Sequence, residues 1–196
     1  MDLAIDQTGT RLRSLNRIAE LGLPVLTEPA SQGDLLRARR CGRIVIREGR
    51  LSAVHGRWWA HAGSLMEVYW QKWRRTLTSD RCELYYHVPW GSSRYLTLDF
   101  VRSGPKTSLS TFYAATLVLD EIARLKDSNA IVCNVTNTRI SDRLMERWGW
   151  QAHCPNWKGR HFIKRLYGEH PTIPRVWRKR LGLGEVGTSA AYFAIR

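Results

Sequence analysis

Hydrophobic and polar residues repeat with two different periods along the chain, and each period predicts one type of secondary structure. The clearest helical pattern runs from Thr111 to Lys126, where apolar residues recur every three or four positions and form one face. Similar spacing predicts shorter helices at 11–22, 31–40, 64–75 and 141–148. Runs of β-branched and aromatic residues between turn signals predict a hairpin at 43–54 and strands at 83–88, 94–101, 130–135, 160–167 and 190–195.

The order of these elements predicts an α/β fold with a mixed, largely antiparallel sheet flanked by helices. Residues 1–167 are expected to form a single α/β domain, of which residues 1–42 are a helical N-terminal part. Residues 168–196 hold two prolines, several glycines and a run of cations, so they are expected to form a basic arm or insertion followed by a final strand.

Charge is distributed unevenly along the chain. The 196 residues include 31 Lys and Arg against 17 Asp and Glu, for a formal net charge of +14. Residues 139–196 hold 12 basic and 4 acidic residues, a net charge of +8, so an anionic partner is expected at this end. The candidate polyanion-binding residues are Arg175, Arg178, Lys179 and Arg180.

Aromatic residues, among them Trp157, Tyr167 and Trp177, are interleaved with these cations. Three interpretations fit this segment. It could bind single-stranded nucleic acid through phosphate contacts and base stacking, or attract an anionic nucleotide cofactor by its charge. It could also be a solvated basic surface that tryptophans anchor to the domain. The other tryptophans are expected in the core or lining a groove, at positions 58, 59, 70, 73 and 90.

Several classes of protein are not favoured by the composition. No stretch of 18 apolar residues is present and the first residues are acidic, so we expect a cytoplasmic protein with no membrane partner. The four cysteines are widely spaced, which favours free thiols. No spacing of His and Cys matches a zinc pattern, so no metal cofactor is expected.

The segment from Ala130 to Gln151 is the most informative part of the chain. It combines a strand, an Asn at 137, a short helix and the pair Gly149-Trp150 before the next strand. This order resembles the C-terminal half of the GNAT superfamily of acyl-CoA N-acyltransferases, where an Asn and a Gly-Phe pair stand at these places. The resemblance covers roughly residues 84–167 and implies an acyl-CoA N-acyltransferase-like fold.

The same resemblance implies a site for acyl-coenzyme A. In the family, the coenzyme lies between two splayed strands and its diphosphate binds N–H groups at the N-terminus of the long helix. This chain departs from the usual glycine-rich turn, because Gly104 is its one glycine there and Pro105 lacks an N–H. Either a modified diphosphate site or a loop that has lost coenzyme binding fits the pattern. The candidate cofactor-binding residues are Arg102, Ser103, Gly104, Lys106, Thr107 and Ser108.

The catalytic groups also depart from the family pattern. Many members place a Tyr four residues before the glycine to protonate the leaving thiolate, but Met145 stands there and cannot donate a proton. Tyr113 or Tyr167 could substitute only if the fold brings one of them near. A general base is expected on the central strands, and the candidates are His87, Glu83 and Asp99, with Asn137 at the family's Asn position.

Three functions follow from these observations. The first is a GNAT-like N-acyltransferase that moves an acyl group from acyl-coenzyme A to an amine. The alternative is a catalytically inactive module of the same fold that binds nucleic acid or another polyanion through its basic C-terminal region. A transferase with another donor, such as an aminoacyl-tRNA, is a third. The acceptor, the acyl group and the oligomeric state stay open.

Overall fold

The computed structural model describes residues 25–26, 33–57, 78–136 and 140–184. Its strands are β1 (Val25–Leu26), β2 (Cys41–Arg47), β3 (Arg50–Arg57), β4 (Arg81–His87), β5 (Tyr95–Ser103), β6 (Ala130–Asn134), β7 (Gln151–Ala152) and β8 (His161–Arg165). Its helices are α2 (Gly33–Ala38), α4 (Leu109–Leu125), α5 (Asp142–Arg147) and α6 (Arg175–Leu181).

The strands form one sheet in the order β1-β3-β2-β4-β5-β6-β8-β7. Neighbouring strands are antiparallel except for β5 and β6, which are parallel and are joined through α4. A parallel pair needs such a crossover because the chain must return to the same end of the sheet. The prediction of an α/β fold with a mixed, largely antiparallel sheet is therefore confirmed.

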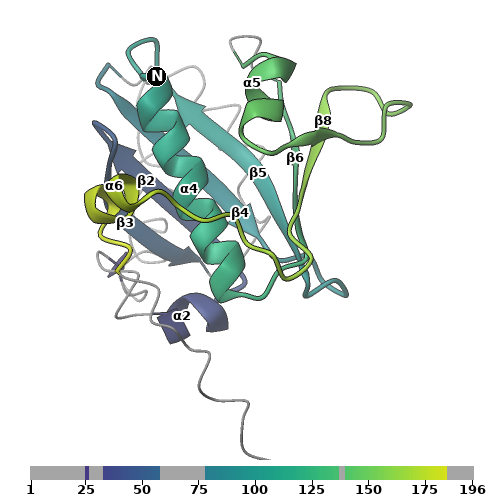
Figure 1. Cartoon of the computed structure of the whole chain (residues 1–196), viewed down its shortest axis with the longest axis horizontal. Helices are drawn as coiled ribbons and strands as arrows, with labels where there is room; N and C mark the ends of the chain where they lie inside the picture. The colour runs from purple at the N-terminus through teal and green to yellow at the C-terminus, as the bar shows by residue number, and fades with distance from the viewer. Residues whose placement is uncertain (1–24, 27–32, 58–77, 137–139, 185–196) are drawn as a thin grey trace, which may run out of the picture.

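Helix α4 crosses one face of the sheet and covers its centre (Figure 1). Ser108 begins it as the N-cap, since its hydroxyl accepts a hydrogen bond from the N–H of Thr111. The apolar side of α4 packs against β2, β3 and β4, and its fully buried residues include Ala115, Leu119 and Ile122. The helical spacing in the sequence thus corresponds to the face that closes the core.

The β2–β3 hairpin turns at Glu48 and Gly49, which have φ angles of 51° and 69°. Two consecutive positive φ values give the turn the twist that antiparallel strands require. The N–H of Gly49 donates to the Oγ1 of Thr111 at 2.9 Å. The tip of the hairpin is thereby fixed to the beginning of α4.

Strands β5 and β6 pair only over their first residues, from Tyr95 opposite Ala130 to Leu98 opposite Cys133. Beyond Leu98, β5 continues to Ser103 without a partner on β6. The register between β4 and β5 also shifts here, so that Asp99 is an extra residue between two paired ones. Such a bulge bends its strand, and it marks the point where β5 diverges from β6.

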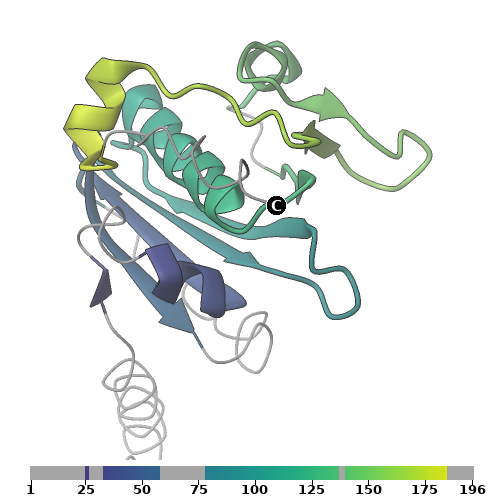
Figure 2. The same ribbon diagram turned by 60° about the horizontal axis from the view of Figure 1, so that its bottom comes forward.

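The connection after β8 crosses the outer side of α4 and leads to α6 (Figures 1 and 2). Ile173 on this connection, Leu181 at the end of α6 and Leu183 beyond it belong to the same hydrophobic core as α4. The expected arm therefore contains a helix, and its apolar residues pack into the core.

Some expectations differ from the structure. The helix expected at 31–40 is shorter, and strands β1 and β7 were not expected. Trp90, expected in the core or lining a groove, lies instead in the β4–β5 turn and is 86% exposed. The guanidinium of Arg40 lies 4.5 Å from its ring centre. The helices expected at 11–22 and 64–75, the strand expected at 190–195 and the remaining tryptophans named with Trp90 lie outside the described residues.

Candidate functional site

One face of the central strands carries a row of polar side chains. Glu83, Tyr85 and His87 alternate along β4, so they point to the face of the sheet away from α4. Leu84 and Tyr86, between them, belong to the core under α4. The register places further cations beside this row, namely Arg43 opposite Tyr85 and Arg102 opposite Glu83. The fold thus gathers several of the predicted catalytic residues on one surface.

His87 is paired with the bulge residue Asp99. Its Nδ1 lies 2.7 and 2.8 Å from the two carboxylate oxygens of Asp99. An ionised carboxylate accepts the Nδ1–H, and this fixes the imidazole tautomer whose basic lone pair is on Nε2. The side chains are 13% and 24% exposed. A neutral histidine held in this way can take a proton from a nucleophile, and it stands where β5 diverges from β6.

Glu83 is held differently. It is 1% exposed, and Arg81 and Arg102 lie 2.5 and 3.7 Å from its two carboxylate oxygens. The hydroxyl of Tyr85 donates to the same carboxylate at 3.0 Å. Burial, and then the charge of Glu83, raise the pKa of Tyr85, so its phenol stays a neutral donor. Glu83 therefore orients its neighbours, and His87 is the better placed base.

The N-terminus of α4, where the family resemblance expects a diphosphate, holds a carboxylate of the chain itself. Asp80 accepts hydrogen bonds from the N–H and the hydroxyl of Ser108, both at 2.9 Å. Burial raises the pKa of Asp80, but hydrogen bonds from Ser108 and Thr111 and the charge of Arg180 outweigh it and lower this pKa overall. The N–H and the hydroxyl of the N-cap residue thus already donate to an anion, and this anion would repel a second one.

Most of the predicted cofactor-binding residues make contacts within the chain. The N–H of Gly104 donates to the Oγ1 of Thr107 at 2.8 Å, and that hydroxyl donates to the carbonyl of Arg81 at 2.7 Å. Arg102 is paired with Glu83, as described above, and Ser103 is paired with β4 as the last residue of β5. Lys106 is exposed. The loop is thus built around Asp80 and its own side chains. Sequence reasoning missed Asp80, because it lies 28 residues before Ser108 and belongs to no local pattern.

The Gly149-Trp150 pair has a local structural role. Gly149 has a φ of 82° and ends α5, and the N–H of Trp150 donates to the carbonyl of Met145. This is the glycine-dependent helix ending in which the residues on either side meet in the core, and both Met145 and Trp150 are buried there. Asn137 lies outside the described residues.

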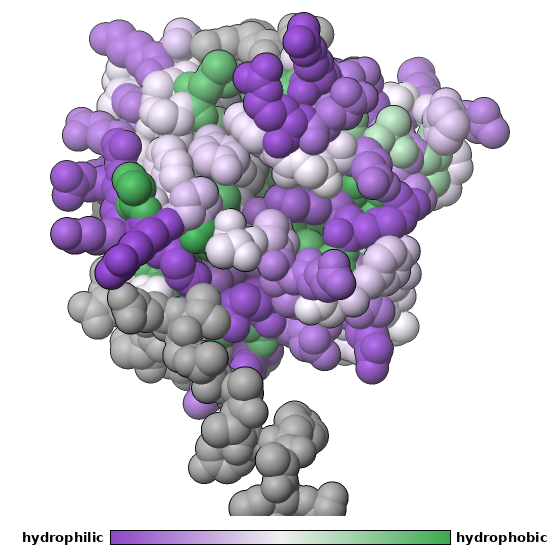
Figure 3. Space-filling model, in the orientation of Figure 1, coloured by the Kyte–Doolittle hydropathy of each residue, from purple (hydrophilic) through white to green (hydrophobic). Residues whose placement is uncertain are grey.

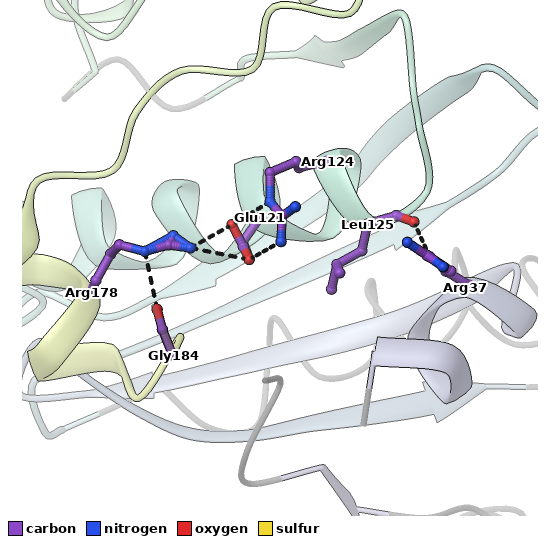
Figure 4. A network of polar contacts seen from close by, with 6 residues as sticks. All are labelled: Arg37, Glu121, Arg124, Leu125, Arg178 and Gly184. Atoms are coloured by element: carbon purple, nitrogen blue, oxygen red, sulfur yellow. Dashed lines mark hydrogen bonds and ion pairs between the residues drawn. The ribbon is translucent and has the colours of Figure 1, made fainter. Parts of the chain in front are cut away.

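Arg178 and Arg180, predicted as polyanion-binding residues, contact other elements of the molecule. The guanidinium of Arg178 lies 3.3 Å from the carboxylate of Glu121, which Arg124 also contacts, and its Nε donates to the carbonyl of Gly184 (Figure 4). Arg180 donates to the carbonyl of Glu48 at 2.7 Å. These contacts attach α6 to α4 and to the hairpin.

The exposed side chains of α6 are Arg175, Val176, Lys179 and Arg180. Hydrophilic side chains project from the surface around this helix (Figure 3). Trp177 instead packs its ring edge-on against Tyr113, with ring centres 5.6 Å apart, so it anchors α6. Trp157 and Tyr167 are 65% and 69% exposed, and they lie before and after β8.

A scan against protein-family models, a search of curated proteins and a search of solved structures each found no match. Within the described ranges, no group of three or more His, Cys, Asp or Glu residues could hold a metal ion. None of the helices in this part of the chain has the length and apolar character needed to cross a membrane.

Proposed function

We propose that this protein is a GNAT-like N-acyltransferase in which His87, held by Asp99, is the general base. The observation that carries the proposal is the 2.7 Å contact between His87 Nδ1 and Asp99 where β5 leaves β6. The resemblance implies that the acyl donor lies between the two diverging strands. A base at that opening would stand beside the carbonyl that the acceptor amine attacks.

In the proposed reaction, His87 transfers a proton and Asp99 stabilises the charge that this creates. The amine nitrogen attacks the thioester carbonyl, Nε2 of His87 takes the proton that the amine loses, and the thiolate leaves as the amide forms. Asp99 stabilises the imidazolium formed in this step. Met145 is buried and cannot protonate the thiolate, so the leaving group takes its proton from solvent or from the imidazolium.

Asp80 also bears on the donor. Because this carboxylate serves the N-terminus of α4, we expect the diphosphate of coenzyme A to contribute little binding. Acetyl-coenzyme A and the acetyl thioester of N-acetylcysteamine should then differ by less than about tenfold in kcat/KM, that is about 1.4 kcal/mol. An enzyme that grips the diphosphate would prefer the coenzyme much more strongly.

The test measures acetylated product by mass spectrometry with either thioester and a set of primary amines: a polyamine, an amino sugar and a peptide amine. His87→Ala should lower the rate by about 10²–10⁴-fold, and Asp99→Asn should lower it too. His153→Ala, outside the site, is the matched control and should leave the rate unchanged. Absence of product with both thioesters, or an unchanged rate in His87→Ala, would reject the proposal.

A second candidate is a module of the same fold that binds a polyanion without catalysis. The occupied N-terminus of α4 favours it, since a domain without coenzyme binding has no need of that site. Arg175 and Lys179 supply its surface, because they are four residues apart on α6 and both exposed.

This candidate predicts that single-stranded RNA binds with an affinity that falls steeply with salt. The double variant Arg175→Ala/Lys179→Ala should weaken binding to all sequences and reduce the slope of log K against log salt by about 1.4, that is about 0.7 for each lost contact with a single strand. Arg143→Ala, an exposed arginine of α5, is the control. RNA binding together with the absence of acyl transfer would replace the first proposal by this one. If the double variant and the control behave alike, α6 is not the interface.

A further inference from the structure

A cavity lies on the other face of the sheet from His87, between α4, the end of α5, β8 and the connection to α6. Its volume is about 270 Å³. Its lining includes Tyr113 and Leu117 of α4, Arg147 and Trp148 at the end of α5, and Thr172 and Ile173 of the connection. This space is several times what a single water occupies, about 30 Å³.

A buried ion pair forms the polar part of the cavity. The ammonium of Lys164 on β8 lies 2.7 Å from Oδ2 of Asp120 on α4, and the two residues are 7% and 3% exposed. The other carboxylate oxygen, Oδ1 of Asp120, is buried and finds no hydrogen-bond partner in the described part of the chain. A buried charged oxygen without a donor is costly, so this atom favours an occupant that brings one.

The ion pair also restricts the charge of the occupant. The carboxylate and the ammonium cancel one another, and the remaining charged residue of the lining, Arg147, is exposed. A ligand that brought a negative charge to the buried pair would oppose Asp120, and one that brought a positive charge would oppose Lys164. A neutral group with an N–H donor beside a carbonyl acceptor matches Oδ1 of Asp120 and the ammonium of Lys164 together. Primary amides, lactams and the edges of nucleobases have this arrangement.

The remaining walls suit a flat ring. The rings of Tyr113 and Trp148 have centres 5.3 Å apart with planes inclined by 35°, and both line the cavity. Burial, followed by the charge of Asp120, raises the pKa of Tyr113, so its hydroxyl stays protonated. Leu117, on the same helix as Asp120, adds an apolar side chain to the lining.

We propose that this cavity is a second binding site, separate from the candidate active site, for a neutral planar amide or lactam. Asp120 accepts from the N–H of this ligand, Lys164 donates to its carbonyl, and its ring lies against Tyr113 and Trp148. Uracil and benzamide are the simplest probes of this chemistry. Benzoate has the same shape as benzamide but places a second carboxylate beside Asp120.

The experiment measures saturation transfer from the full-length protein to each probe by NMR, at millimolar concentrations. Uracil and benzamide should bind, and benzoate should bind at least about tenfold more weakly than benzamide. Asp120→Asn should weaken uracil binding by about tenfold or more, because the single amide oxygen would accept from Lys164 and an NH2 donor would then face the N–H of uracil.

A second variant keeps the test valid if Asp120→Asn fails to fold. Thr172→Trp places an indole at the exposed rim of the cavity, leaves the ion pair intact and should abolish binding of uracil. Glu169→Trp adds the same group at an exposed position that does not line the cavity, and it should bind uracil as the wild type does. No transfer to either neutral probe, equal binding of benzoate, or undiminished binding in Thr172→Trp would overturn the proposal.

Discussion

At the scale of single residues, the packing of β2 against β4 leaves no space for a side chain at position 42. A Cβ atom at Gly42 would lie 2.5 Å from the hydroxyl of Tyr86, its partner across β2 and β4, and 2.6 Å from the ring carbon that carries this hydroxyl. Tyr86 is 2% exposed, so its ring has no space into which to move. On the opposite strand, a Cβ at Gly56 would meet the flexible side chain of Arg39 at 3.4 Å.

We therefore expect Gly42→Ala to lower the free energy of unfolding by about 1–3 kcal/mol through overpacking. Gly56→Ala, at the position paired with Gly42, should change it by less than about 1 kcal/mol, because the Arg39 side chain can shift. Urea unfolding of both variants measures the difference. Equal effects of the two substitutions would show that the contact with Tyr86 does not constrain this position.

At the scale of elements, the beginning of α4 is the meeting point of several segments. Asp80 accepts from the N–H of the N-cap residue Ser108, and the hydroxyl of Ser108 accepts from the N–H of Thr111. Thr111 also attaches α4 to the β2–β3 hairpin, and the charge of Arg180 on α6 acts on Asp80. A carboxylate at this end also interacts favourably with the helix dipole. The end of α4 at which the family resemblance expects a diphosphate thus has a carboxylate of the chain itself bonded to its N-cap residue.

Asp80→Asn should lower the free energy of unfolding by about 1 kcal/mol at neutral pH, since it removes the charge from a helix N-terminus. The pKa of Asp80 is lowered in the folded state from 3.8. Its contribution is thus complete above that value and is lost as the pH falls through the folded-state pKa. Chemical unfolding at neutral and acid pH should show a difference from the wild type that vanishes in acid. Asp34→Asn, in the exposed first turn of α2, is the control and should show a smaller difference.

At the scale of the whole molecule, the connection after β8 and α6 close the outer side of α4. Ile173, Leu181 and Leu183 enter the common core, and Arg178 reaches Glu121 across α4. The same connection forms one wall of the cavity that holds Asp120 and Lys164. We infer that residues 168–184 stabilise the sheet domain and shape the cavity that we propose as a second site.

The variant Leu181→Asp should therefore destabilise the whole domain by more than about 3 kcal/mol, because it buries an unpaired charge in the common core. Val176→Asp introduces the same group on the same helix at a position that is 78% exposed, and it should be nearly neutral. Thermal unfolding followed by circular dichroism distinguishes them. A Leu181→Asp variant with the melting temperature of the wild type would mean that α6 is only loosely attached.

The sequence by itself determined the class of the fold and most of its described elements. The long helix, the hairpin and the central strands follow from the spacing of apolar residues. This spacing is a local property, because it is set by residues only a few positions apart in the sequence. It also placed His87, Glu83 and Asp99 on strands and singled out the loop before α4. The helical boundaries at Ser108 and Gly149 correspond to residues with a local capping role.

Only the tertiary structure decided which of these residues meet. The bulge at Asp99 turns its carboxylate to His87, Asp80 reaches Ser108 from 28 residues away, and Lys164 finds Asp120 across 44 residues. It also exposed Trp90 in the β4–β5 turn and packed Trp177 of α6 against Tyr113. The physical reason is that these contacts depend on how the elements are stacked, and a local period carries information only about which side of an element faces the core.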